Sequence, residues 1–513
     1  MSITKNSVFL RAMLALWLGL KRAGDNSVLG RGLDRLGAWV CRVLEGSLLW
    51  RFLWREGRVP KAWPHSLACR VFTGLINLPC ALVKWLYQLG RPVWEGSWFC
   101  RLLAACGGVP AFFLGLVMLV MLVAPHALWN NVYGFAAAVA LLGLFVAGSA
   151  SRSRMRLELD RMGPYFTLYA GFICIALLGS LSTRLSLRFF FFHVTGFLLA
   201  LILVSGVRRY EQLQLAVALA VAGISVAALY GCYQGYIGVE VVPNQQDMVV
   251  NAGMPGRVYS FFDNPNNFAE QLEMLLPLDL ALLMNSRGWR GRLWSLCSLC
   301  LGAAAIGFTL SRSGWIGLAL AVVVFFALLD WRVVPLVLLV GLAAIPFLPE
   351  SIYNRILTIG NMKDTSTQYR FKIYDTTANL MRDHWVRGVG LGTDIMRQVF
   401  RTYPTIVDGT YPVHTHNNYL QMWGEAGIWG LVSYLALLLY QLKTGFRSVL
   451  AATDRRVKRL LAAAMGSFCG ILVIGVAEYT WYYPRNMFTW WFLFGVAGAC
   501  VKLVQLDRDK SRA

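Results

Sequence analysis

The sequence predicts an all-α protein that crosses a membrane many times, and two observations carry this prediction. Of the 513 residues, 57% are hydrophobic and only 14% are charged, whereas ordinary soluble proteins carry about 25% charged residues. Apolar runs of about 18 residues or more, each long enough to cross a bilayer, recur from residue 103 to the C-terminal end. A soluble enzyme and a secreted, disulfide-linked scaffold are therefore excluded.

The length and hydropathy of these runs predict about twelve transmembrane helices. The two runs at 293–310 and 313–329 are separated by a very short Ser311-Arg312 link, which has to turn the chain sharply. The other expected helices lie at 103–123, 131–149, 165–182, 188–206, 213–234, 267–285, 333–348, 419–442, 460–479 and 488–506.

Lys and Arg are concentrated in alternate connections between these runs, such as 152–161, 287–292 and 443–459, and they are sparse in the others. Membrane proteins keep such residues on the cytoplasmic side, so both termini are expected there. Residues 236–266 and the long segment 349–418 then face outward. Because a loop of this length in a compact bundle is usually functional, 349–418 is expected to be partly helical and to carry the site.

The formal net charge of +22 lies between the apolar runs and in residues 1–101, which hold 15 Lys and Arg against 5 Asp and Glu. This distribution favours anionic lipid, and not nucleic acid, as the partner of the charge. We expect 1–101 to form a cytoplasmic extension on the membrane surface, with partner docking as the alternative. Residues 102–506 then form the transmembrane domain, and 507–513 form a cytoplasmic tail.

The expected outer side combines isolated arginines with three histidines, His384, His414 and His416. A histidine at this position has a pKa near neutrality and can accept a proton. His414 and His416 could instead bind a metal or serve as interfacial polar residues, but no cysteine or carboxylate cluster supports a metal site. Two glutamates near the outer face could orient a base, Glu425 and Glu478, although nothing in the sequence selects either one. Arg485 is expected to anchor an aromatic outer turn.

Several short motifs, taken in order, resemble those of the bacterial O-antigen ligase and polysaccharide polymerase superfamily. The resemblance covers about residues 160–500 and leaves the first hundred residues outside. Its motifs are the outward segment Arg257 to Asn264-Pro265-Asn266, the helix entry Ser311-Arg312, the loop helix Tyr369-Arg370-Phe371, the glycine turn Gly388, Gly390 and Gly392, and the signature His416-Asn417 with Gly427 and Gly430.

The resemblance implies a GT-C-like membrane fold that transfers a glycan from a polyprenyl-diphosphate-linked donor to a glycan or glycolipid acceptor, with neither cofactor nor metal. It implies an inner-membrane protein of bacteria with its active site outside the cytoplasm. By the same resemblance, Arg257 and Arg370 hold the diphosphate and His416 activates the acceptor hydroxyl. Further substrate contacts are expected from Arg312, Asn266, Asn417 and His414. The glycines at 427 and 430 are expected to allow close helix approach.

Two other classes of protein fit parts of the same pattern. A transporter, such as a flippase of lipid-linked glycans, would also have about twelve spans and outward arginines, but transporters commonly show repeated halves, and none is visible here. A non-catalytic scaffold could bind the lipid-linked glycan through the same arginines. Within the leading reading, polymerase and ligase differ only in the acceptor, and both remain open.

Overall fold

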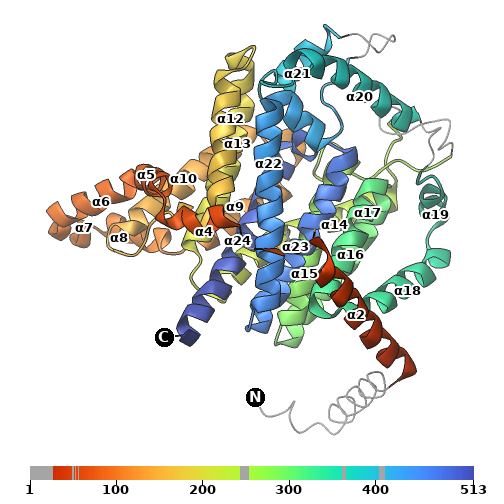
Figure 1. The fold of residues 1–513 in the computed structure, drawn as a ribbon, viewed down its shortest axis with the longest axis horizontal. Helices are drawn as coiled ribbons and strands as arrows, with labels where there is room; N and C mark the ends of the chain where they lie inside the picture. Colours follow the sequence, from red (N-terminus) through yellow and green to blue (C-terminus); the bar gives the residue numbers. More distant parts are fainter. Residues whose placement is uncertain are drawn as a thin grey trace.

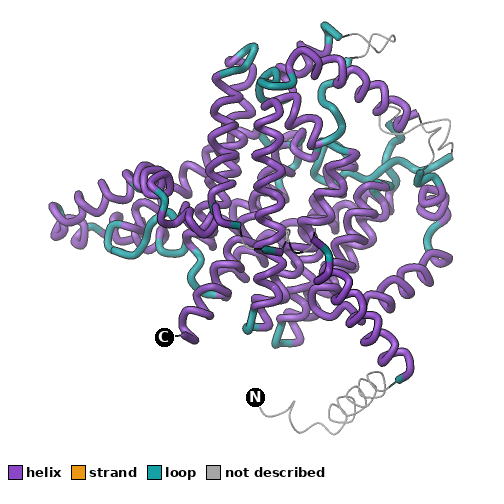
Figure 2. Tube along the Cα trace, in the orientation of Figure 1, coloured by secondary structure: helices purple, strands orange, loops and turns teal. Residues whose placement is uncertain are grey.

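The computed structural model describes residues 27–512, apart from 49–50, 52–53, 56, 243–252, 361–364 and 404–410. The described residues form helices and loops, with no strand among them (Figure 2). Eight helices in this part of the chain are long and apolar enough to cross a membrane, and there are up to ten if each of two bent helix pairs counts as one span. The prediction of an all-α, polytopic membrane protein is therefore confirmed.

The bundle is built from long helices that run side by side (Figure 1). Glycines on α23 allow its backbone to approach α17, because a Cβ at Gly466 would lie only 2.4 Å from the carbonyl oxygen of Ala321. The almost fully buried α24 packs against α13 and α23. The bundle helices are α10 (Asn131–Ser149), α12 (Pro164–Leu178), α13 (Thr183–Gly206), α14 (Tyr210–Ile237), α15 (Pro265–Asn285), α16 (Trp289–Phe308), α17 (Arg312–Asp330), α22 (Asn418–Ala451), α23 (Arg455–Ala477) and α24 (Pro484–Arg512).

Four differences from the expected spans explain why the structure has fewer candidate membrane helices than the sequence suggests. The run at 165–182 forms only the 15-residue α12. The runs at 313–329 and 333–348 join into one candidate segment, Arg312–Phe347. The run at 267–285 forms α15, which buries three carboxylates, Glu270, Glu273 and Asp279, and is too charged to count among the eight. The 103–123 run is bent by 77° between α8 (Trp98–Gly107) and α9 (Pro110–Val123).

The described part of the 1–101 extension is helical, and its residues 1–26 lie outside the described residues. Figure 1 shows α5, α6, α7 and α8 projecting to one side of the bundle, beside α10. The apolar stretch at 71–83 lies in two successive helices, α5 and α6, which together form a pair bent by 55°. The helices of the extension are α2 (Val28–Gly46), α4 (Arg58–Ala62), α5 (Leu67–Ile76), α6 (Leu78–Leu89) and α7 (Arg91–Gly96).

The long segment 349–418 folds over one end of the bundle, which we call the loop face. It contains α19 (Glu350–Leu357), α20 (Thr365–His384) and α21 (Thr393–Phe400), so the expectation that this segment is partly helical is confirmed. Figure 1 shows α20 and α21 at the opposite end of the bundle from α2 and the C-terminal end of α24. The remaining short helices are α11 (Leu159–Met162), α18 (Val334–Ala344), η1 (Trp63–His65), η2 (His126–Leu128), η4 (Trp331–Val333), η5 (Ile345–Phe347) and η6 (Thr480–Tyr482).

Candidate active site

His416 is held at the loop face by the beginning of α22. Asn417 is the N-cap of this helix, and its side-chain oxygen accepts hydrogen bonds from the backbone N–H groups of Tyr419 and Leu420 at 2.9 Å. Its amide also donates to the Val476 carbonyl at 2.8 Å. Asn417, expected as a possible substrate contact, therefore uses its side chain to fix the chain directly after His416.

The backbone of His416 lies in the left-handed region, with φ of 49°. Only a few residues other than glycine adopt this conformation, and such strain concentrates at functional sites. The backbone N–H of His416 donates to Nδ1 of His414 at 3.2 Å, which helps to hold the turn. His414 and His416 thus form one local unit, as their spacing in the sequence suggested.

Glu478 connects His416 to the cationic part of the site. It directly follows α23, beyond the end of the spanning helix, and its Oε2 lies 3.3 Å from Nδ1 of His416. Its Oε1 accepts hydrogen bonds from the Arg370 guanidinium and, at 3.2 Å, from the amide of Asn266. One carboxylate therefore joins α20, α15 and the segment before α22.

Arg257 reaches the same carboxylate through Asn266. Its guanidinium is buried, donating from Nε to the Thr309 carbonyl at 2.8 Å and from a terminal nitrogen to Oδ1 of Asn266 at 2.5 Å. Asn266 lies in the first turn of α15, after the N-cap Asn264. The structure therefore brings together Arg257, Asn266, Arg370 and His416, all four of which the sequence singled out.

Two further arginines surround this group. Arg312, the first residue of α17, donates to the Thr358 carbonyl at 2.9 Å. Arg355 is buried at the end of α19 and donates to the Leu310 carbonyl at 3.3 Å. Burial, and then the charge of Arg355, lower the pKa of Arg257 to about 9. Arg312 thus lies beside the site, as expected, and Arg355 is an addition that the sequence did not indicate.

The charges of this group favour an anionic ligand. Burial by itself raises the pKa of the Glu478 carboxyl, but the charge of Arg370 and the hydrogen bond with His416 outweigh it and bring the pKa to about 2. Glu478 is thus ionised at neutral pH and interacts with the charges of Arg370 and Arg257. Arg257 in turn lies near the charges of Arg312 and Arg355. Planar guanidinium groups bind phosphate oxygens in a bidentate way, so the excess of positive charge suits a diphosphate.

His416 itself is arranged as a base. When Nδ1 donates its proton to the Glu478 carboxylate, the imidazole is held in the tautomer that leaves Nε2 as the acceptor. No residue that the structure describes forms a hydrogen bond with that Nε2, and 30% of the side chain is exposed. The exposed nitrogen can therefore take a proton from a bound molecule.

His414 supports this arrangement from behind. Its ring lies 4.2 Å from that of His416 and 4.6 Å from that of Tyr482, centroid to centroid. Its burial, and then the neighbouring His416, hold the pKa of His414 well below its ordinary value. Because Nδ1 of His414 already accepts the His416 N–H, this nitrogen is not directed at a metal ion shared with His416. The contact between the two residues is one of packed rings. Its place is structural support for His416.

Two residues considered from the sequence lie outside this constellation. Glu425 is buried within α22, where it accepts from Gln421 at 2.7 Å and from the Tyr479 hydroxyl at 3.2 Å. Arg485 is fully buried and donates to the carbonyls of Met121 and Ala124. It also lies over three aromatic rings, which fits the expected role of an aromatic anchor.

Glu478 and Arg355 are the functional candidates that the sequence did not select. The available signal for Glu478 was a carboxylate directly after a long apolar run, a position that is costly unless it serves a purpose. Glu425 is also expected near the outer face, so this signal did not distinguish Glu478 from Glu425. Arg355 lies in a polar loop helix where charged residues are ordinary, so no signal marked it.

A protein-family model described as O-antigen ligase matches residues 297–435 of the chain. The match runs from α16 into α22 and includes Arg312, Arg370, His414 and His416, whereas Arg257 and Glu478 lie outside it. The chain has no significant match among curated proteins. The matched segment covers about a quarter of the chain and, with the motifs that precede and follow it, supports the resemblance to the O-antigen ligase and polysaccharide polymerase superfamily, whose members are membrane glycosyltransferase-like enzymes.

Proposed function

We propose that this protein transfers a glycan from a polyprenyl-diphosphate-linked donor to a sugar hydroxyl, without metal or cofactor. The observation that carries the proposal is the Glu478 carboxylate, which touches both the base His416 and the guanidinium of Arg370. A proton acceptor and a guanidinium that can bind a diphosphate leaving group thus share one carboxylate. The acceptor would be a glycan or a glycolipid, in keeping with a polymerase or a ligase.

The reaction needs both halves of this site. The acceptor oxygen attacks the anomeric carbon of the donor sugar, and the bond from that carbon to the diphosphate oxygen breaks. The acceptor proton passes to Nε2 of His416, which serves as general base. The electron pair leaves with the lipid diphosphate, whose growing negative charge is met by Arg257 and Arg370. A direct displacement of this kind inverts the anomeric configuration.

We further propose that the loop face lies outside the cytoplasm, in the inner membrane of a bacterium. The connections at 152–161 and 443–459 are rich in Lys and Arg. The positive-inside rule assigns such connections to the cytoplasmic side. The C-terminal end of α24 lies at the opposite end of the bundle from α20 and α21 (Figure 1). Both termini are then cytoplasmic, and a lipid-linked donor presented at the outer leaflet reaches the arginines.

Reconstitution with a purified lipid-diphosphate oligosaccharide tests this function. We expect His416→Ala and Arg257→Ala each to abolish transfer while the protein still accumulates in membranes. The matched controls are His384→Ala and Arg382→Ala, both on α20 and away from Glu478, which should keep transfer. Undiminished transfer by His416→Ala would remove its role as base. The product itself distinguishes the two subclasses, because a polymerase elongates a lipid-linked glycan and a ligase caps a different acceptor.

A further inference from the structure

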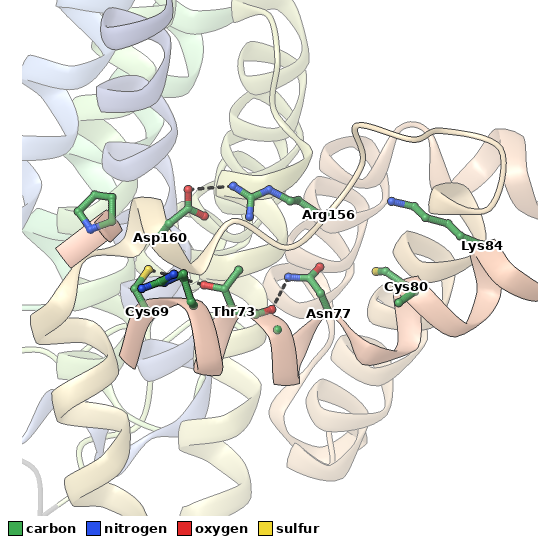
Figure 3. Close-up of a pocket in the computed structure, with 11 residues that line it drawn as sticks. Cys69, Thr73, Asn77, Cys80, Lys84, Arg156 and Asp160 are labelled. Atoms are coloured by element: carbon green, nitrogen blue, oxygen red, sulfur yellow. Dashed lines mark hydrogen bonds and ion pairs between the residues drawn. The ribbon is translucent and has the colours of Figure 1, made fainter. Parts of the chain in front are cut away.

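A cavity lies where the N-terminal extension meets the bundle, far from His416 in the fold. It has a volume of about 440 Å³ and is enclosed by α5, α6 and the segment before and within α11 (Figure 3). Its polar wall includes Arg70, Thr73, Lys84, Arg156 and Asp160. The proposed transfer reaction uses none of these residues.

Specific hydrogen bonds build the walls of this cavity. Asn77 occupies the break between α5 and α6, where its amide donates to the Leu157 carbonyl at 2.9 Å and its oxygen accepts from the Leu157 N–H at 2.8 Å. The Lys84 ammonium donates to the carbonyls of Ser153 and Met155 at 3.0 and 2.8 Å. The corner of the extension is therefore fastened to the 153–157 loop, and the cavity is a built feature of the joint.

The cavity carries an excess of positive charge. Arg156 pairs with Asp160 at 3.0 Å, which leaves the charges of Arg70 and Lys84 without a neighbouring carboxylate on the wall. Lys84 has donated two of its three N–H groups to carbonyls. The guanidinium of Arg70 forms no hydrogen bond or ion pair with any residue that the structure describes. Because Arg70 and Lys84 are fourteen residues apart on successive helices, an anion with several oxygens would pair with Arg70 and not with both cations at once.

The surroundings of the cavity are apolar. Large side chains on α5 and α6 expose half or more of their surface, which a water-soluble protein would avoid in a cluster. Together α5 and α6 are as long and apolar as a membrane segment. A ligand with a charged head and hydrocarbon chains satisfies both the Arg70 cation and this apolar surface. The exposed residues are Leu67, Leu75, Leu78, Leu82 and Trp85.

We propose that this cavity binds the phosphate of an anionic phospholipid head group, with the acyl chains lying along α5 and α6. Arg70 offers a planar fork to two oxygens of this phosphate, whereas Lys84 stays bonded to the 153–155 loop at the other end of the cavity. The arginine-rich loop that closes the cavity belongs to the basic side of the protein, where anionic lipids attract such segments. The site holds the extension against the bilayer, and it is independent of the glycan-transfer function.

Native mass spectrometry of the full chain in detergent, titrated with phosphatidylglycerol or phosphatidylcholine, tests the proposal. We expect a phosphatidylglycerol adduct that forms at lower lipid concentration than the phosphatidylcholine adduct. Arg70→Gln should weaken the phosphatidylglycerol adduct on the order of tenfold, because it removes a charge-assisted, bidentate contact. Arg101→Gln, which removes an exposed arginine of α8 outside the cavity, should leave the adduct unchanged.

A second variant fills the cavity and keeps every charge. Gly74 lines the cavity within α5, and a Cβ added there meets no atom within 4 Å, so Gly74→Leu is compatible with the helix. We expect it to weaken the phosphatidylglycerol adduct while the melting temperature is retained. Equal loss in Arg70→Gln and Arg101→Gln, or full binding by Gly74→Leu, would overturn the proposal. If inorganic phosphate alone displaces phosphatidylglycerol at equal concentration, the site belongs to free phosphate and the lipid assignment fails.

Discussion

Glu478 is the side chain that turns separate motifs into one site. Arg370 and Asn266 share its Oε1, and His416 faces its Oε2. A carboxylate that orients an imidazole and stabilises its protonated form is a recurrent way to strengthen a base. Here the same carboxylate also positions a guanidinium, so its loss should affect both halves of the reaction.

We predict that Glu478→Gln lowers kcat by about 10²-fold or more, the range that general-base catalysis contributes. The amide keeps the size of the side chain but loses the negative charge that fixes the His416 tautomer. Initial rates of transfer with the reconstituted enzyme provide the measurement. Glu425→Gln, which also neutralises a buried glutamate of the same region, serves as the control and should retain most activity. A Glu478→Gln enzyme with an unchanged kcat would contradict this role.

His414 makes the stability of the protein depend on pH. Its pKa in the folded protein is held well below the ordinary 6.5 by burial and by His416, so the folded chain keeps this imidazole neutral. When the pH falls below about 6.5, the unfolded chain binds a proton that the folded chain does not. The free energy of unfolding is then full above that pH and declines steadily below it.

We predict that the melting temperature in detergent falls between about pH 7.5 and pH 5.5, and that His414→Asn falls less over this range. Asparagine cannot titrate, but its Oδ1 can accept the His416 N–H in place of the imidazole nitrogen. Transfer activity should therefore be kept better by His414→Asn than by His414→Ala. Identical pH profiles for wild type and His414→Asn would show that another group causes the acid sensitivity.

A break within α22 ties the long loop to the bundle. Gly427 leaves the helical conformation, with φ of 67° and ψ of −174°. At this break the N–H groups of Val389 and Gly390 donate to the carbonyls of Gly424 and Glu425 at 2.8 and 3.0 Å. The glycine turn that follows α20 is thereby pinned to α22, a few residues after His416.

Gly427→Ala is predicted to destabilise the protein by about 2 kcal/mol or more and to lower transfer, because a Cβ there combines a disfavoured φ with a backbone clash. That Cβ would lie 2.0 Å from the Val386 carbonyl oxygen. Gly171→Ala on α12, where a Cβ meets no atom within 4 Å, is the matched control and should keep its melting temperature and activity. Equal behaviour of the two variants in thermal unfolding would show that the break tolerates a side chain.

A helix could be predicted from the sequence where the residues of that segment alone determine it. The apolar runs predicted the long bundle helices, and the segment 349–418 was expected to be partly helical, as α20 is. The number of membrane spans could not be predicted from each segment alone. Whether 165–182 forms a full span, or whether 313–329 and 333–348 form one segment or two, depends on neighbours that cap or bend each helix. Hydropathy by itself carries no information about those neighbours.

A buried ion cluster joins distant parts of the whole chain at the basic side of the bundle. The Lys502 ammonium of α24 lies 2.9 Å from Oε2 of Glu158 and also donates to the Val204 carbonyl at 2.7 Å. Arg208 pairs with the other carboxylate oxygen at 2.7 Å. Both Lys502 and Glu158 are buried. Removal of Glu158 leaves the Lys502 ammonium with backbone carbonyls alone, whereas removal of Lys502 leaves Glu158 paired with Arg208 and, at 3.2 Å, with Arg161.

For this cluster we predict that Glu158→Gln lowers stability by about 3 kcal/mol, because it leaves the buried Lys502 ammonium without a carboxylate, and that Lys502→Met costs less, because Glu158 keeps Arg161 and Arg208. The double variant Glu158→Gln/Lys502→Met should lose less than the sum of the two single variants, because no unpaired charge remains. Melting temperatures of the four proteins in detergent give this comparison. Strictly additive losses would mean that the two side chains act independently.

The class of this protein follows from its composition and run lengths, because the need to satisfy backbone hydrogen bonds in lipid leaves helices as the solution for long apolar segments. The motifs around Arg257, Arg370 and His416 likewise identify the segments that build the site. The point where these segments meet cannot be read from the motifs. Glu478 lies 62 residues from His416 and 108 from Arg370 along the chain, and only the packing of α15, α20, α22 and α23 brings its carboxylate to both. Local sequence sets which segments are apolar or charged, whereas long-range packing sets which of those charges share one carboxylate.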